Sequence, residues 1–249
     1  MPRTPHLKSD EAGTMPVYPM RINKYLAFTG KATRREADTL IEKGLVFLND
    51  KRVTLGQKVE QGDTVEIRGQ GAKHYVYLAF NKPKDIITLA TEPGEKDCTS
   101  FLPSDLKRLR LFPLGRLDKA SSGLILLTND GRLTDRLLNP VYDHAKTYEV
   151  TTKLPLRPSF ATHMGAGVDI EGYVTKPTHV EVVGEQRFKI VLTEGKKHQI
   201  RRMVVAMHNE VKDLRRTGIM NISLGKLKPG EYRRLRDREL TTLLSSLGL

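Results

Sequence analysis

The fold of the larger part of this chain is decided by the stretch LGRLDKASSGLILLTNDG, residues 114–131. One carboxylate, Asp118, lies between Arg116 and Lys119 in a segment bounded by glycines. The apolar run 124–127 is too short for a helix and ends at a turn signal, so it predicts a buried strand. A charged loop beside a rigid strand is a common way to place a functional side chain. The alternative is that Asp118 only caps a turn and that the basic side chains are solvated.

A tyrosine follows in the segment KTYEV, residues 146–150, which predicts the start of a strand. The face of the Tyr148 phenol can stack on a nucleobase, an interaction of about 1–3 kcal/mol. Its hydroxyl can also transfer a proton. The alternative is a tyrosine packed in the core of the sheet.

A third motif is EGKKHQIRRM, residues 194–203. Apolar residues at 200, 203, 204 and 207 predict the buried face of a helix. Lys196 and Lys197 precede the first turn of that helix, where free N–H groups and the helix dipole favour anions. Arg201 and Arg202 are expected to point away from the core. They could also be ordinary surface arginines.

These three motifs, in this order, resemble those of RNA pseudouridine synthases of the group that acts on ribosomal RNA and carries an N-terminal S4 domain. The resemblance implies that Asp118 is the catalytic residue and that Tyr148 lies against the target uracil. It implies that Arg201 forms an ion pair that keeps a buried Asp118 ionised, and that Arg116 fills the space left by a flipped-out base. It also implies no cofactor and no metal. Whether the aspartate is a nucleophile at the sugar or a base stays open.

Two other acidic positions carry less weight. Asp130 is predicted to be a turn residue rather than a second catalytic acid. Residues 82–85 read KPKD, whereas the family has a Lys-Pro-x-Gly segment. Because Asp85 stands where glycine is usual, the geometry of this loop is an open question.

The N-terminal part predicts a small separate unit. Ile22, Tyr25, Leu26 and Phe28 predict a short helix, and the segment 33–36 predicts a capping box for a second helix that ends at Gly44. Strands are expected at 46–48 and 64–67. This order of elements over residues 20–68 resembles an S4 RNA-binding domain. The basic side chains that the resemblance assigns to RNA are Arg34, Arg35, Lys51 and Arg52, which could otherwise form a solvated face.

Composition narrows the class of partner. The 249 residues carry 42 Lys and Arg against 29 Asp and Glu, a net charge of +13, which favours a polyanion such as RNA. The single cysteine, Cys98, excludes an intrachain disulfide and a cysteine-built zinc site. No metal-ligand pairing of histidines, membrane-length apolar run or signal-peptide core is found. We therefore expect a cytoplasmic monomer that binds ribosomal RNA and neither a metal nor a membrane.

The predicted fold class is α+β. We expect a disordered tail at 1–19, the S4-like domain at 20–68, a linker at 69–74 and a catalytic domain at 75–249. This last domain is expected to be a strand-rich, mostly antiparallel mixed sheet. Its strands are predicted at 75–80, 168–170, 179–183 and 188–193, besides those of the motifs above.

The predicted activity is isomerisation of a specific uridine in ribosomal RNA by base flipping and by aspartate-dependent cleavage and rejoining of the glycosidic bond. Segments 216–224 and 230–233 favour large-subunit 23S over small-subunit 16S RNA. The alternative is a non-catalytic RNA-binding ribosome-assembly factor. A glycosidase would need two carboxylates, and only one is a candidate. The side chains expected to bind RNA in the catalytic domain are Arg116, Lys119, Lys146, Lys196, Lys197 and Arg202.

Overall fold

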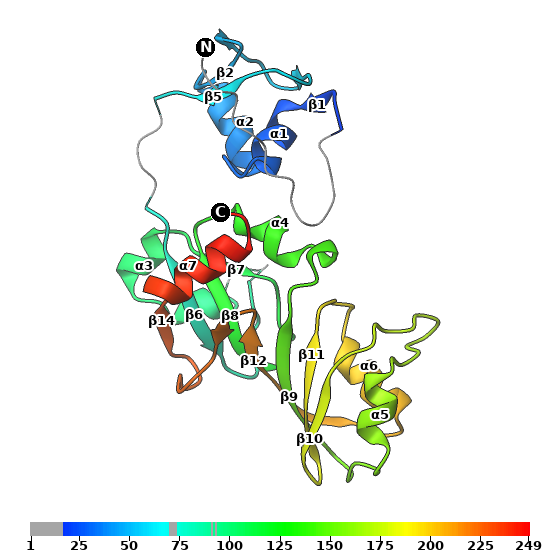
Figure 1. Cartoon of the computed structure of the whole chain (residues 1–249). Helices are drawn as coiled ribbons and strands as arrows, with labels where there is room; N and C mark the ends of the chain where they lie inside the picture. The colour runs from blue at the N-terminus through cyan, green and yellow to red at the C-terminus, as the bar shows by residue number, and fades with distance from the viewer. Residues whose placement is uncertain (1–16, 70–73, 91, 93) are drawn as a thin grey trace. The chain divides into compact units, whose positions relative to one another are not determined.

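The computed structural model describes residues 17–69, 74–90, 92 and 94–249. The chain folds into two compact units, whose positions relative to each other are not determined (Figure 1). The first holds the described residues up to His74 together with Gly131–Arg136 and Ser246–Leu249, and the second holds Tyr75–Asp130 and Leu137–Ser245. Most of the predicted tail and linker, at 1–16 and 70–73, lies outside the described residues.

The first unit contains two helices packed on two small sheets. Helix α2 begins as its sequence predicts, because the Thr33 hydroxyl accepts from the Glu36 amide at 3.2 Å and the Glu36 carboxylate accepts from the Thr33 amide at 2.8 Å. Buried Ile22, Leu26 and Ala37 lie in the core between the elements. The elements are β1 (Met20–Arg21), α1 (Ile22–Phe28), α2 (Arg34–Glu42), β2 (Val46–Leu48), β3 (Lys51–Arg52), β4 (Lys58–Val59) and β5 (Val65–Ile67).

The second unit is built on a nine-stranded sheet with the order β10-β11-β9-β12-β8-β6-β14, to which β13 and β7 add at the side. Among the strands of this sheet that the structure describes, only β12 and β8 pair in parallel. The expected α+β class with a mixed, mostly antiparallel sheet is confirmed. Its strands are β6 (Tyr77–Lys82), β7 (Phe112–Leu114), β8 (Ser122–Thr128), β9 (Lys146–Thr152), β10 (Val180–Gly184), β11 (Arg187–Leu192), β12 (Val211–Ile219), β13 (Ile222–Ser223) and β14 (Tyr232–Arg234).

Short helices flank this sheet. Helix α6 (Gln199–Ala206) buries Ile200, Met203 and Val204, as the spacing of its apolar residues predicts. The remaining helices of this unit are η1 (Cys98–Phe101), α3 (Ser104–Arg108), η2 (Pro140–Tyr142), α5 (Phe160–Gly165) and α7 (Asp237–Ser246). Helix α4 (Leu133–Leu138) crosses the boundary between the two units, because its residues up to Arg136 belong to the first. Within the described part of the chain, no helix is long and apolar enough to cross a membrane.

Two strand predictions need correction. The strand expected at 168–170 is wrong, because only an isolated bridge joins Asp169 to Val174. Gly167, Glu171 and Gly172 all have positive φ angles there, which interrupts the extended backbone. The strand expected at 75–80 is displaced and runs from Tyr77 through Lys82, ending where a proline removes the backbone N–H.

Candidate active site

The segment that decided the fold lies between two antiparallel strands. Strand β7 ends at Leu114, which pairs with Leu126 of β8, and residues 115–121 form the connection. Leu117 turns into the core, whereas the Asp118 side chain is 42 % exposed. The expectation of a buried carboxylate is therefore wrong. An exposed carboxylate stays hydrated without an ion pair, so its charge needs no buried partner.

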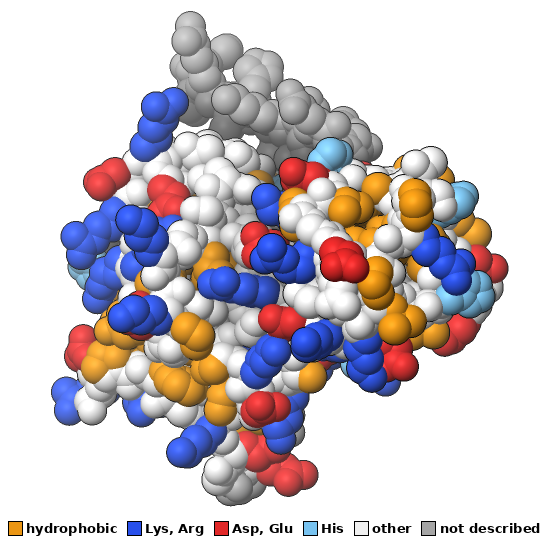
Figure 2. Space-filling view, turned by 90° about the horizontal axis from the view of Figure 1, so that it is seen from below, with side chains coloured by type: hydrophobic (Ala, Val, Ile, Leu, Met, Phe, Trp, Pro, Cys, Tyr) orange, Lys and Arg blue, Asp and Glu red, His pale blue; other side chains and the backbone are white. Residues whose placement is uncertain are grey.

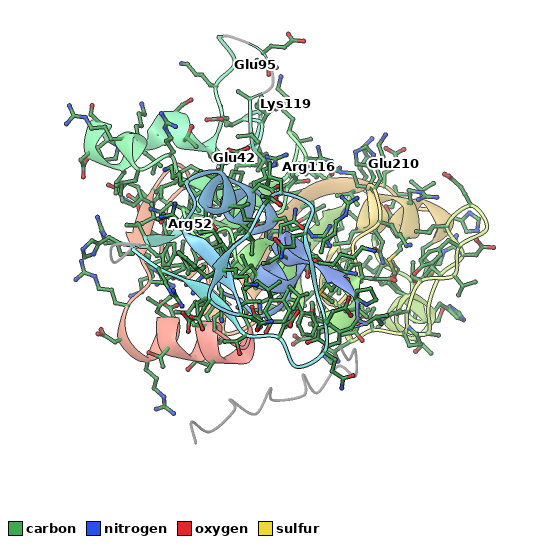
Figure 3. The ribbon with its side chains drawn as sticks, turned by 90° about the horizontal axis from the view of Figure 1, so that it is seen from above. Glu42, Arg52, Glu95, Arg116, Lys119 and Glu210 are labelled. Carbon is green, nitrogen blue, oxygen red and sulfur yellow. The ribbon has the colours of Figure 1, made fainter. Side chains whose placement is uncertain are left out.

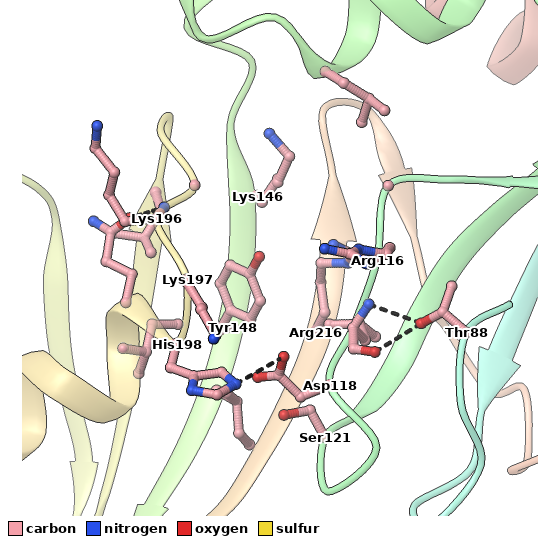
Figure 4. A pocket seen from close by; sticks show the side chains of 18 of the residues that line it. Thr88, Arg116, Asp118, Ser121, Lys146, Tyr148, Lys196, Lys197, His198 and Arg216 are labelled. Carbon is pink, nitrogen blue, oxygen red and sulfur yellow. Dashed lines mark hydrogen bonds and ion pairs between the residues drawn. The ribbon is translucent and has the colours of Figure 1, made fainter. Parts of the chain in front are cut away.

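A threonine fixes the backbone next to Asp118. The hydroxyl of buried Thr88 donates to the Leu117 carbonyl at 2.7 Å and accepts from the Leu117 amide at 2.9 Å (Figure 4). One side chain thus satisfies both backbone groups of the residue that precedes the candidate aspartate. Sequence reasoning missed Thr88, because it lies about thirty residues upstream and a lone threonine carries no signal.

Lys82, at the end of β6, holds the other side of the same loop. Its side chain is fully buried, and the ammonium donates to the carbonyls of Pro83 at 2.8 Å, Ile86 at 2.6 Å and Lys119 at 3.4 Å. Asp85 stands where the family usually has glycine, and it adopts the left-handed backbone conformation at φ +63°, which aspartate tolerates. The loop at residues 82–85 can therefore form without the glycine. The Asp85 amide then donates to the Lys119 carbonyl at 2.8 Å.

Replacement of Lys82 by methionine is expected to reduce the free energy of unfolding by about 1–3 kcal/mol at neutral pH, because it leaves buried carbonyls without a donor. Burial lowers the pKa of Lys82 from its ordinary 10.5, against the opposing charges of Asp85 and Asp118. The unfolded chain then binds more protons than the folded one, so this group's contribution to stability rises with pH up to about 10.5.

Urea unfolding at neutral pH and near pH 10 measures both effects for Lys82→Met. The stability advantage of the unsubstituted protein should grow at the higher pH. Lys107→Met, at an exposed position of α3, is the matched control and should show neither change. A Lys82→Met protein as stable as the parent at both pH values would contradict the role given to this ammonium.

Arg201 does not form the expected ion pair with Asp118 in the described structure. Its guanidinium donates to the Ala120 carbonyl at 3.4 Å and to the Ser121 hydroxyl at 3.2 Å, so it contacts the loop rather than the carboxylate. The group that faces Asp118 is His198, whose Nε2 lies 3.4 Å from the Asp118 Oδ1 (Figure 4). His198 has φ +52° at the N-terminal end of α6, and this left-handed turn directs the imidazole toward the loop.

A cavity of about 840 Å³ brings together side chains from three distant parts of the second unit. Asp118 and Tyr148 both line it, and the half-buried Tyr148 pairs with Ile190 of β11 across the sheet. The predicted basic residues that line it are Arg116, Lys119, Lys146, Lys196 and Lys197. Three of the lining residues, Glu95, Arg116 and Lys119, can be located on the ribbon in Figure 3. Lys and Arg side chains are spread over the face shown in Figure 2, with Asp, Glu and hydrophobic side chains between them.

The other predicted basic residues lie elsewhere. Arg202 donates to the Ile170 carbonyl at 2.7 Å and to the Glu171 carboxylate at 2.8 Å. In the first unit, Arg34, Arg35, Lys51 and Arg52 are all exposed. Their role toward RNA stays a prediction.

Glu194 positions the basic segment 195–198, and sequence reasoning missed it. Burial alone would raise its pKa, but hydrogen bonds from the Tyr173 hydroxyl, the Lys176 amide and the Gln199 side chain outweigh burial and lower the pKa. The Gln199 amide donates to Glu194 at 2.7 Å and accepts from the Lys196 amide at 2.9 Å. An ionised carboxylate therefore anchors the turn that leads into α6.

Asp130, the other acid of the signature stretch, is fully buried and accepts a hydrogen bond from the Tyr77 hydroxyl at 2.7 Å. Asp130 lies in the connection between β8 and α4, and its side chain is buried there. A third missed residue, after Thr88 and Glu194, is Arg216 of β12, which lines the cavity with only 3 % exposure. In the sequence, Arg216 belongs to no motif beyond the late segment 216–224.

Comparisons with protein families, related sequences and solved structures all match RNA pseudouridine synthases. Residues 76–206 match the RNA pseudouridylate synthase family and residues 20–65 match the S4 domain. The chain is 45 % identical over 234 residues to the dual-specificity RNA pseudouridine synthase RluF of Escherichia coli O157:H7, covering 92 % of this chain and 80 % of that protein. It is 34 % identical to ribosomal small subunit pseudouridine synthase A of Vibrio parahaemolyticus, covering 90 % and 99 %. A crystal structure of a pseudouridylate synthase superposes with a TM-score of 0.67 at 28 % identity, covering 92 % and 99 %.

Proposed function

This chain belongs to the RNA pseudouridine synthase family and carries an S4 domain, and we propose that it converts one uridine of ribosomal RNA, in 23S rather than 16S RNA, to pseudouridine. Identity to the enzyme named for the small subunit, at 34 %, is lower than identity to RluF, at 45 %, whose name carries no small-subunit assignment, and this supports the preference against 16S RNA. The observation that carries the proposal is the cavity in which Asp118, Tyr148 and the basic rim meet.

The reaction breaks the bond from sugar C1′ to uracil N1 and forms a bond from C1′ to C5. N1 gains a proton and C5 loses one, so the product is an isomer of the substrate. The target base must first leave the stack, at a cost of a few kcal/mol. Exposed Arg116 is suited to occupy the vacated space, because a planar guanidinium stacks on bases and contacts phosphates.

Asp118 acts at the sugar, either as a nucleophile at C1′ or as a base at the neighbouring carbon. Its carboxylate is exposed to the cavity while the backbone on both sides is fixed by Thr88, Lys82 and Arg201. Such pre-organisation reduces the reorganisation that a reacting group undergoes. Tyr148 supports the uracil by stacking, and the lysines of the rim contact phosphates.

Release of tritium from C5-labelled RNA tests the proposal, because bond formation at C5 expels that hydrogen and binding alone does not. Transcripts of 23S, 16S and transfer RNA are compared, the last because the relative RluF is named as having dual specificity. We expect release from the 23S transcript. Release from the 16S transcript alone would overturn the subunit assignment. RNA binding without release from any transcript or assembly intermediate would indicate a ribosome-assembly factor.

Thr88→Val is expected to lower kcat about tenfold with little change in KM, because a displaced reacting group loses much of its effective concentration. Valine keeps the shape of the side chain but cannot bond both backbone groups of Leu117. Thr88→Ser keeps the hydroxyl and should retain most of the activity. Equal losses in the valine and serine variants would show that packing, rather than the hydroxyl, matters at this position.

A further inference from the structure

Arg216 lies beside the candidate base-stacking tyrosine. On β12 it pairs with Tyr148 of β9 on one side and with Gly123 of β8 on the other. Residues that pair across neighbouring strands point their side chains to the same face of a sheet. Arg216 and Tyr148 therefore project together into the cavity that they both line (Figure 4).

One end of the Arg216 guanidinium has no partner. Its Nε donates to the Leu124 carbonyl at 2.7 Å, which fixes the orientation of the group. Its Nη2 is buried and has no hydrogen-bond partner among the residues described. A buried donor left unpaired costs about 1–3 kcal/mol, so a native protein that keeps one calls for an explanation.

A second cation lies close to Arg216. Burial and the charge of Arg216 both lower the pKa of Lys146, which lines the same cavity. The Lys146 ammonium donates to the His144 carbonyl at 3.1 Å. Neither cation forms an ion pair with a carboxylate within the described part of the chain. Two cations without a carboxylate in ion-pair contact therefore line the cavity with Tyr148, so an anion bound between them would be stabilised.

We propose that Arg216 is a further catalytic residue, whose guanidinium stabilises the negative charge that the target uracil acquires when it leaves the sugar. This inference rests on the proposed function. When the bond from C1′ to N1 breaks, its electron pair stays on N1 and is shared with the uracil carbonyl oxygens. Reattachment through C5 uses that charge, after which the C5 proton departs to solvent. Both routes open to Asp118 detach the base as an anion, so the assignment holds for either.

The depth of Arg216 suits it to this role better than the lysines of the rim. A fixed cation shielded from water acts on a developing charge more strongly than exposed lysines, which solvent and salt screen. Lys196 and Lys197 are exposed, whereas Arg216 is 3 % exposed. A uracil seated against Tyr148 would also supply the acceptor that the Nη2 lacks.

Arg216→Gln is expected to lower kcat about 100-fold, the usual effect of removing one charge-stabilising donor, while KM changes little. The matched control is Arg215→Gln, which removes the same charge from the adjacent residue on the opposite face of β12. Its kcat should stay near that of the parent. Equal kcat values for Arg216→Gln and the parent would overturn the proposal.

A leaving-group comparison separates charge stabilisation from a structural role. RNA containing 5-fluorouridine carries a base whose anion the fluorine already stabilises, so its detachment depends less on Arg216. The deficit of Arg216→Gln, measured as disappearance of 5-fluorouridine from digested RNA, should shrink relative to its deficit with uridine. A deficit of the same size with both bases would overturn the proposal.

If Arg216→Gln does not fold, the same comparison is made with Arg216→Lys, which keeps the charge but loses the fork of donors. Its deficit should also be smaller with 5-fluorouridine, and an equal deficit overturns the proposal. The parent protein must release tritium from uridine in every series. Its failure to do so would refute the proposed function itself, which distinguishes the two results.

Discussion

Asp118→Asn is expected to leave the protein folded and able to bind RNA while reducing tritium release by about 10³-fold or more. Asparagine has the same shape, but it is neither a nucleophile nor a base. The bonds that hold this loop involve the backbone of Leu117, Lys119 and Ala120, none of which the substitution removes. The contact that it weakens is the approach of His198 to Asp118, whose side chains are 49 % and 42 % exposed.

Single-turnover tritium release, together with a binding titration, checks this result. Asp105→Asn is the matched control, because Asp105 is an exposed aspartate of α3 outside the cavity. It should release tritium at the rate of the parent. Substantial turnover by Asp118→Asn would remove the aspartate from the chemistry and leave the cavity without its candidate for attack at the sugar.

Local patterns could predict much of this fold. The apolar run after Gly123 became the buried strand β8, and the capping box at Thr33 became the start of α2. In both places the signal lies within a few residues and the interactions that it predicts are equally local. Asp118 and Tyr148, from two separate motifs, line one cavity in the structure, in keeping with the family resemblance of those motifs.

The partners of those residues could not be predicted in the same way. The register of β12 against β9 and β8 places Arg216 beside Tyr148, and no local pattern encodes that register. The left-handed backbone at His198 decides which side chain faces Asp118, so Arg201 contacts the loop instead. Lys82 looks like a surface lysine in sequence, yet three carbonyls from different turns of the chain make its burial possible.

Gly123→Ala is expected to reduce the free energy of unfolding by about 3–5 kcal/mol, the sum of backbone strain and overpacking. Gly123 has φ +108°, a conformation that side chains with a Cβ rarely adopt. A Cβ at this position would lie 2.2 Å from the carbonyl oxygen and 2.6 Å from the amide nitrogen of Arg216. These are backbone atoms of the neighbouring strand, so relief requires β8 and β12 to move apart.

Urea unfolding measures the loss, and Gly195→Ala serves as its control. Gly195 also lines the cavity, but a Cβ there meets no atom within 4 Å. Its free energy of unfolding should change by no more than about 0.5 kcal/mol, as for most surface substitutions. Because the separation of β8 and β12 would displace Arg216 and the end of the Asp118 loop together, folded Gly123→Ala should also lose turnover. A stable and fully active Gly123→Ala protein would show that the close approach of these two strands is not what holds the site together.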